Sequence, residues 1–174
     1  PPEHTSYRRL IEPYFAPGPM AQFEPVSDRI AADLVASAPR GRPIEVMDTL
    51  GREFAVRVQC AFMGWSSDLH HPLRAWLDEQ HRATLAEDLD ALAASARRFD
   101  DVVRKVLDAR RDAGVDASDD PSTRLLGERV DGRPLTDSEI VSIVRNWTVG
   151  ELGTIAASVG IIVAYLADHP DVVT

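Results

Sequence analysis

An acid and a hydroxyl alternate with two glycines in the longest apolar stretch of the chain, as Gly150-Glu151-Leu-Gly153-Thr154. Helical residues three or four apart share a face, so the glycines would leave a gap where a flat or bulky group could approach the backbone. Thr154 could donate to the carbonyl of Gly150 or leave that carbonyl free for water. A buried hydroxyl and carboxylate at such an opening suit proton delivery. The alternative is close helix–helix packing around a fully hydrogen-bonded threonine.

A second constellation lies near the start of the sequence. His4 and Arg8 are four residues apart and would share one helix face. Two donor groups one turn apart suit an anionic ligand such as a carboxylate. The alternative is a solvated face on which Arg8 pairs with a nearby glutamate.

Composition excludes several other classes of site. Cys60, the single cysteine, lies in an apolar helical stripe, which is typical of a small buried hydrophobe and excludes an internal disulfide. His70, His71 and His81 have no third ligand at a spacing usable for metal. The net charge of −9 gives no electrostatic case for nucleic acid or an anionic membrane. No signal-peptide pattern is present, so we expect a cytoplasmic location.

The glycine-flanked acid must be positioned by a helix over residues 137–168. Thr136 and Glu139 form a capping-box pattern before it, and Pro170 ends it. The uncharged run from Leu152 to Ala167 is 16 residues long, short of the ~20 that cross a bilayer. Apolar residues fall on every side of the run, which predicts a core helix buried all round.

The helical spacing of apolar residues, and the prolines and glycines that interrupt it, predict that nearly all of the remaining chain is helical as well. Pro17-Gly18-Pro19 is interpreted as a turn, residues 44–47 as at most one short strand, 115–120 as a polar loop, and Asp131-Gly132 as a turn. The predicted fold class is all-α, in one domain spanning residues 1–174. The further helices are expected near residues 5–14, 20–37, 48–63, 67–85, 87–113 and 121–129.

Three stretches together resemble the soluble bacterial cytochrome P-450 haem-thiolate monooxygenases. Residues 1–10, PPEHTSYRRL, are similar to the start of that family's C helix, and residues 57–64, RVQCAFMG, to its E helix. Residues 150–154, with His-Pro-Asp at 169–171, are similar to its I helix and the end of that helix. The resemblance covers the whole chain and implies a helical core from the C to the I helix, with both ends apparently cut.

By this resemblance, His4 and Arg8 would hold the propionates of haem b. Gly150 and Gly153 would open the I helix over the distal face of the haem. Thr154 would be the residue that assists oxygen activation.

The same resemblance makes Glu151 a candidate proton source and places Asn146 and Val149 on the substrate side. Gly153 stands where the family usually has its acid, so which acid relays protons is open. Residues 66–113 would be the F and G helices, which form a mobile lid.

The implied activity is monooxygenation, as hydroxylation or O-/N-dealkylation, of a small organic substrate. Electrons from NAD(P)H would arrive through a ferredoxin or flavin reductase, or through a fused reductase. Cys60 stands in the E-helix position and cannot be the haem thiolate. The loop that carries the thiolate follows the I helix in the family, so these 174 residues alone would be inactive.

Two rival interpretations stay open. One is a non-catalytic, truncated helical module that self-associates and binds no haem; the other is a helical regulator with a closed apolar pocket for a small ligand. If the long helix is left uncovered, residues such as Leu152, Ile155, Val159 and Ile162 would be exposed, which predicts a homo-oligomer.

Overall fold

The computed structural model describes residues 2–114 and 120–173, and confirms the all-α class. A two-residue antiparallel hairpin, β1 (Arg129–Val130) with β2 (Arg133–Pro134), is the only sheet in the described residues. Short turns of 3₁₀ helix lie at Glu12–Phe15, Ser67–Leu69 and Pro170–Val173, and a π-helical turn lies at Met47–Gly51. The α-helices are α1 (Pro2–Ile11), α2 (Pro17–Ser37), α3 (Arg52–Met63), α4 (His70–Leu85), α5 (Leu89–Ala113), α6 (Pro121–Gly127) and α7 (Asp137–Asp168).

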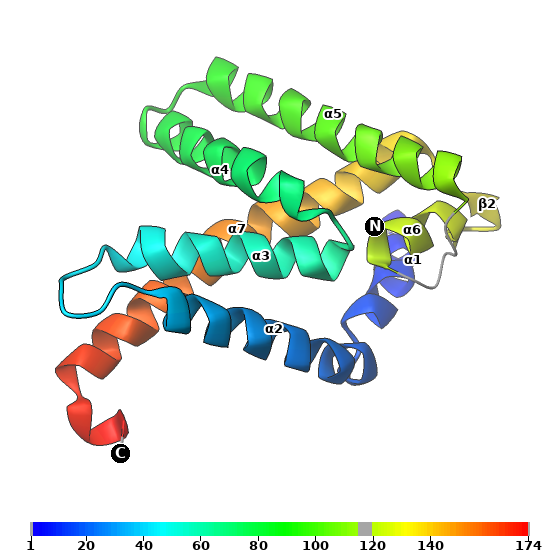
Figure 1. Cartoon of the computed structure of the whole chain (residues 1–174). Helices are drawn as coiled ribbons and strands as arrows, with labels where there is room; N and C mark the ends of the chain where they lie inside the picture. Colours follow the sequence, from blue (N-terminus) through cyan, green and yellow to red (C-terminus); the bar gives the residue numbers. More distant parts are fainter. Residues whose placement is uncertain (1, 115–119, 174) are drawn as a thin grey trace.

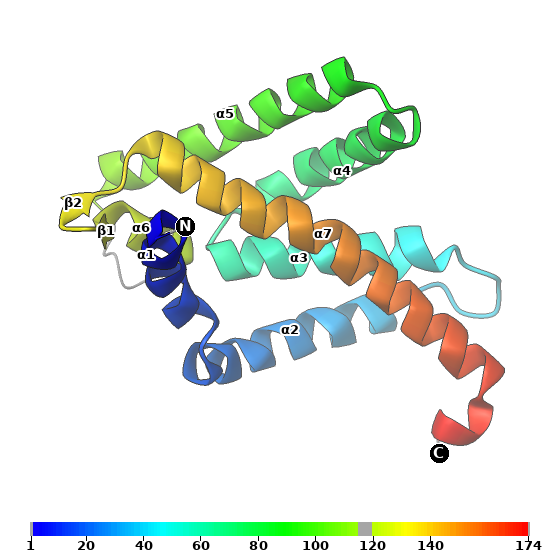
Figure 2. The ribbon, with the colours of Figure 1, turned by 180° about the vertical axis from the view of Figure 1, so that it is seen from behind.

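The long helix α7 runs diagonally across the molecule and packs against α3 along its middle (Figures 1 and 2). The antiparallel pair α4 and α5 lies to one side of α3, and α2 lies to the other. Seen from behind, α7 is in front of α3 and no other helix crosses over it (Figure 2). One side of α7 is therefore covered by the fold, and the other is not.

The start of α7 is fixed as the sequence predicts. Glu139 N donates to Thr136 Oγ1 at 3.3 Å, and Thr136 N donates to Glu139 Oε2 at 2.7 Å, which completes the capping box. Leu135 before the cap and Ile140 after it are both buried. The cap removes two unpaired backbone donors and sets the direction in which α7 leaves the hairpin.

A single hydrophobic core joins α3, α4, α5 and the first half of α7. Its fully buried members include Ala55, Val56, Met63, Phe99, Val103, Leu107, Leu125, Val144 and Leu152. Larger apolar residues of α3 and of the turn before it, Leu50, Phe54, Val58 and Phe62, are only half-buried. The face of α3 that is buried carries smaller residues, because α3 lies close to α7 and a large side chain would hold the two helices apart.

Two glycines lie where the π-helical turn Met47–Gly51 packs most closely against α7. A Cβ on Gly51 would lie 2.8 Å from the carbonyl oxygen of Ala156, and a Cβ on Gly160 would lie 2.5 Å from Met47 Sδ. Gly51 is buried in the turn that leads into α3. Close helix packing is thus provided by Gly51 and Gly160, and not by the glycines near Thr154.

Some local predictions are wrong. Pro17-Gly18-Pro19 is the first turn of α2 and not a separate turn, since proline fits the first helical positions, where its missing N–H is not needed. Residues 44–47 form no strand, which agrees with the expectation of at most one short strand; Glu45 accepts from Asp48 N beside the π-helical turn Met47–Gly51. Most of the predicted loop at 115–120 lies outside the described residues.

The prediction that α7 is buried all round is also wrong. Leu152 and Ala156 are buried, but Ile161 is 70% exposed, Ile162 57% and Tyr165 52%. Leu152, which was expected to be exposed if the helix were uncovered, is instead fully buried against α3. Apolar residues on all sides of this helix predict burial all round, but the described residues bury only one side of it.

Candidate functional site

A cleft of about 1210 Å³ separates the beginning of the chain from the first half of α7. One wall is α1, the 3₁₀ turn after it and the first residues of α2. The other wall is one face of α7, with residues spaced three and four apart. The lining residues are Tyr7, Arg8, Arg9, Ile11, Glu12, Pro13, Phe15, Ala16, Pro17, Glu139, Ser142, Ile143, Asn146 and Trp147.

The inner end of the cleft is aromatic. Phe15 meets the ring of Trp147 edge-on at 5.1 Å between ring centroids, and the buried Tyr14 lies 5.2 Å from the same ring. Tyr14 donates to Glu128 Oε1 at 2.9 Å, and the guanidinium of Arg124 lies 4.3 Å over its ring. Burial, followed by this hydrogen bond, raises the pKa of Tyr14, so the phenol stays protonated and the aromatic wall stays neutral.

The outer end of the cleft carries two exposed arginines, Arg8 and Arg9. No hydrogen bond or ion pair ties either guanidinium to another described residue, so the expected alternative, Arg8 paired to a local glutamate, does not occur there. His4 lies in α1, but its side chain is outside the described ones. Unpaired guanidinium groups beside an apolar wall suit a ligand with a flat apolar body and carboxylates at one edge.

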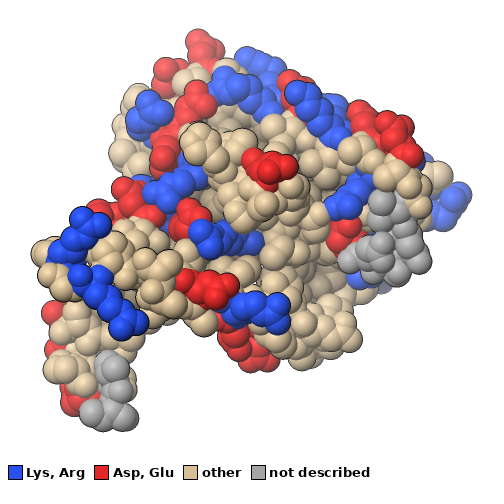
Figure 3. All heavy atoms as spheres, viewed as in Figure 1, with Lys and Arg blue, Asp and Glu red and all other residues tan. Residues whose placement is uncertain are grey.

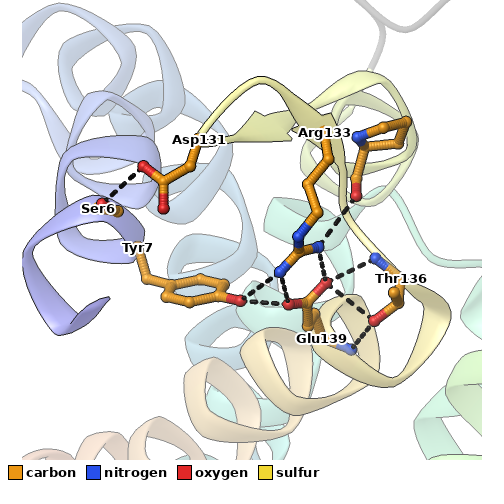
Figure 4. A network of polar contacts seen from close by, with 7 residues as sticks. Ser6, Tyr7, Asp131, Arg133, Thr136 and Glu139 are labelled. Atoms are coloured by element: carbon orange, nitrogen blue, oxygen red, sulfur yellow. Dashed lines mark hydrogen bonds and ion pairs between the residues drawn. The ribbon is translucent and has the colours of Figure 1, made fainter.

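A network of polar contacts joins α1 to the start of α7 (Figure 4). Arg133 binds Glu139 with two hydrogen bonds, Nη2 to Oε1 at 2.6 Å and Nη1 to Oε2 at 2.9 Å. The Tyr7 hydroxyl donates to Glu139 Oε1. The bond to Arg133, then that to Tyr7, hold the pKa of Glu139 well below its usual range, so the carboxylate stays an acceptor.

Beyond the cleft, the same face of α7 continues uncovered through Gly150, Gly153 and Thr154, all exposed. A Cβ on either glycine would meet nothing within 4 Å. No contact in the described residues therefore requires glycine at these two places, although each costs about 1 kcal/mol relative to alanine in a helix. The Thr154 hydroxyl donates to the carbonyl of Gly150 at 2.7 Å, the first of the two arrangements that the sequence allows.

The two acid–base candidates are not buried, contrary to expectation. Glu151 and Thr154 are both exposed, and Glu151 makes no hydrogen bond or ion pair with a described residue. Asn146 lines the cleft, whereas Val149 is half-buried and packs against the hydrophobic core. The structure thus brings Arg8 and Asn146 to opposite walls of one cleft, and places Gly150, Gly153 and Thr154 on its open extension.

Sequence reasoning missed Tyr7, Arg9 and Glu139 as cleft residues. Tyr7 and Arg9 flank Arg8 in the sequence, but only the placement of α1 beside α7 shows that all three face the same space. Glu139 was identified only as a helix cap, because the capping pattern gives no sign of the tyrosine that also binds it.

The other sequence candidates have structural roles. Cys60 is buried, and burial raises the pKa of its thiol to about 12, so it is an inert core residue. Glu79, at the surface of α4, pairs with Arg98 of α5 at 2.6 Å. Arginines and acids are interleaved over the face formed by α3, α4 and α5 (Figure 3). The described residues contain no cluster of three potential metal ligands.

The shape and chemistry of the site fit part of a haem pocket. A flat macrocycle needs an uncovered helix face without side chains, which Gly150 and Gly153 provide. Its carboxylates need donors at one edge, which Arg8 and Arg9 provide. An axial thiolate is the one part that the described residues do not supply, since the Cys60 thiol is buried in the core.

Comparison with known proteins shows what the chain is similar to. The chain is 29% identical over 171 residues to the probable cytochrome P450 127A1 of Sinorhizobium fredii, covering 98% of this chain and 40% of that protein. The crystal structure of CYP101J2 matches with a TM-score of 0.82 and 26% identity, covering 99% of this chain and 41% of that one. Over nearly its whole length the chain is thus similar to about two fifths of cytochrome P450 proteins.

A third similar protein is the erythromycin C-12 hydroxylase of Saccharopolyspora erythraea, 27% identical over 174 residues, covering 98% of this chain and 43% of that protein. The chain therefore spans about two fifths of the length of the curated relatives it matches. No family model matches it. By length and composition α7 could cross a membrane, the only helix of the described part that could, but one such helix is weak evidence because core helices pass the same criteria.

Proposed function

We propose that this P450 chain forms the distal wall and the propionate-binding edge of the haem site in a monooxygenase. The observation that carries the proposal is the uncovered face of α7, where two helix-weakening glycines meet nothing in the described chain. When bound, haem b would supply the activation of dioxygen for inserting one oxygen atom into an organic substrate.

The arginines of α1 would hold the carboxylates of the cofactor. Arg8 and Arg9 are exposed, line the cleft and lack an acid partner among the described residues. A charged group that has no partner in the protein can form a strong, charge-assisted hydrogen bond with a ligand carboxylate. We assign this role to Arg8 first, with His4 one turn before it.

Thr154 would hold a proton at its hydroxyl oxygen on the cofactor side of α7. Its hydrogen is now directed to the Gly150 carbonyl at 2.7 Å, which leaves the oxygen lone pairs free to accept from water. Glu151, one turn away and exposed, is the proposed source of protons. Asn146 and Val149 would border the substrate.

The remaining parts of the enzyme follow from what these residues lack. Cys60 is the single cysteine and is buried, so the axial thiolate must come from outside the 174 residues. Electrons from NAD(P)H would come through a ferredoxin or flavin reductase, separate or fused. The bacterial relatives support a cytoplasmic location.

Thr154→Ala in the haem-loaded protein tests the proposal. We expect more hydrogen peroxide released per NAD(P)H consumed, because the proton held at this hydroxyl is lost. Ser158→Ala is the matched control, since Ser158 makes the same type of bond, to the Thr154 carbonyl at 2.8 Å, one turn further along. Equal peroxide release in both variants would make Thr154 structural. Glu151→Gln in the same assay tests the proton source.

A second candidate is supported by the exposed apolar residues at the end of α7. Ile161, Ile162 and Tyr165 would be covered by a second copy if these 174 residues act as a self-associating helical module without haem. Light scattering of the 174-residue protein at micromolar concentration tests this candidate. A well-folded monomer would exclude it.

A further inference from the structure

The helix that carries Arg8 and Arg9 is weakly anchored. Helix α1 has 10 residues, fewer than the ~12–15 that an isolated helix needs in water. None of its described side chains is buried; Tyr7, Leu10 and Ile11 are only half-buried against the core. Its position must therefore depend on the few side-chain contacts that it makes with the rest of the fold.

The polar contacts of its described side chains with the rest of the fold come from two consecutive residues (Figure 4). Ser6 donates to Asp131 Oδ1 at 2.9 Å, on the turn of the β1–β2 hairpin. Tyr7 donates to Glu139 Oε1 at the start of α7, and its hydroxyl accepts from Arg133 Nη2 at 3.4 Å. The two arginines follow immediately in the sequence, so the turn of α1 that these bonds hold in place is also the turn that lines the cleft.

The acceptor of the Tyr7 bond is itself held firmly. Glu139 receives two hydrogen bonds from Arg133 and two more from the backbone and hydroxyl of Thr136, at 2.7 and 2.9 Å. A carboxylate with this many donors has one orientation. The Tyr7 hydroxyl is therefore bound to a fixed point on α7, and not to a mobile surface acid.

We propose that Tyr7 is a positioning residue, which sets the place of Arg8 at the cleft through its bond to Glu139. This inference rests on the proposed function of Arg8 as a ligand of the haem carboxylates. Tyr7 itself would not touch the cofactor. Loss of the Tyr7 hydroxyl would let α1 move away from α7, and Arg8 would then bind the haem carboxylates less well.

Tyr7→Phe in the haem-loaded protein is the test, because it removes the hydroxyl and keeps the ring. We expect haem affinity to fall up to about tenfold, since one hydrogen bond to a charged group is worth roughly that factor. Amide hydrogen exchange in α1 should become faster. Tyr165→Phe is the matched control, as the Tyr165 hydroxyl makes no hydrogen bond with a described residue, and it should change neither quantity.

A double-mutant cycle with Arg8→Gln separates positioning from general stabilisation. If Tyr7 acts through Arg8, Tyr7→Phe has little further effect on haem affinity in the Arg8→Gln background. Additive losses would show a merely structural role for Tyr7 and overturn the inference. Glu139→Gln supplies a second variant, and it should reproduce the effect of Tyr7→Phe on both readouts.

The outcomes distinguish the two proposals. If Arg8→Gln leaves haem affinity unchanged, the role proposed for Arg8 is wrong, and the positioning inference falls with it. If Arg8→Gln weakens haem binding while Tyr7→Phe changes neither affinity nor exchange in α1, only the positioning inference is overturned.

Discussion

Two pairs of glycines in this chain have opposite surroundings. Gly51 and Gly160 lie where helices cross, and a methyl group on either would collide with Ala156 or Met47. Gly150 and Gly153 lie on the same long helix as Gly160, yet a methyl group on either would meet no described residue within 4 Å. The first pair is explained by packing within the chain; for the second pair, no contact among the described residues requires glycine.

The largest change in stability should come from adding a methyl group at Gly51, where the turn before α3 packs against α7. In Gly51→Ala the added methyl would lie 2.8 Å from the Ala156 carbonyl oxygen, a backbone atom that cannot turn away. We expect a loss of about 1–3 kcal/mol in the free energy of unfolding, as for other overpacked sites. Urea denaturation measures it, and a stability equal to wild type would show that α3 and α7 are less closely packed than the structure indicates.

Alanine in place of Gly150 or Gly153 should instead increase the stability of the protein. Gly150→Ala and Gly153→Ala should each raise the free energy of unfolding of the cofactor-free chain by about 1 kcal/mol, because alanine is the better helix former and no neighbour is displaced. The same urea titration measures the change. A destabilised variant would mean that another part of the protein already covers this face.

The change in unfolding free energy caused by Gly160→Ala should lie between these two changes. The added methyl would meet Met47 Sδ at 2.5 Å, but this atom belongs to a flexible side chain that can move. The gain in helix propensity then largely offsets the cost of moving Met47, so the net change in unfolding free energy should be within about 0.5 kcal/mol of zero. A loss as large as that of Gly51→Ala would contradict the difference drawn between backbone and side-chain contacts.

The smallest expected effect is a change with pH at the junction of α1 and α7. The pKa of Glu139 is lower in the folded protein than its ordinary value of 4.5, so its contribution to stability is fully present above that value. The contribution is lost as the pH falls through the lowered pKa. The stability difference between wild type and Glu139→Gln should therefore be constant near neutral pH and shrink below about pH 4.5. A difference that does not change with pH would show that the Glu139 pKa is not lowered.

Local sequence signals predicted much of the framework. The capping box of Thr136 and Glu139, the cap of Asp120 and the glycine ends at Gly64 and Gly114 all lie at the predicted helix ends. These signals depend on residues within one turn of each other, so no tertiary context is needed to interpret them. The burial of Cys60 follows from its apolar stripe in the same way.

What the sequence could not predict depends on which helices meet. Smaller residues of α3 such as Ala55, together with Gly51 just before it, are buried while several of its larger apolar residues are not, because α7 lies so close; this closeness is not encoded in the periodicity of α3. The exposure of Thr154 and Glu151 has the same origin, since an apolar helix does not reveal what covers each of its faces. The bond between Tyr7 and Glu139, 132 residues apart, has no local signal at all.

The central claim is that the uncovered glycine face of α7 is a cofactor surface. Haem affinity of Gly153→Leu, measured together with its unfolding free energy in the haem-free form, tests this claim most directly. The account predicts that leucine fills the open face without lowering the stability of the haem-free form, while haem affinity falls at least tenfold. Haem bound as tightly as in wild type, in a protein of unchanged stability, would contradict it.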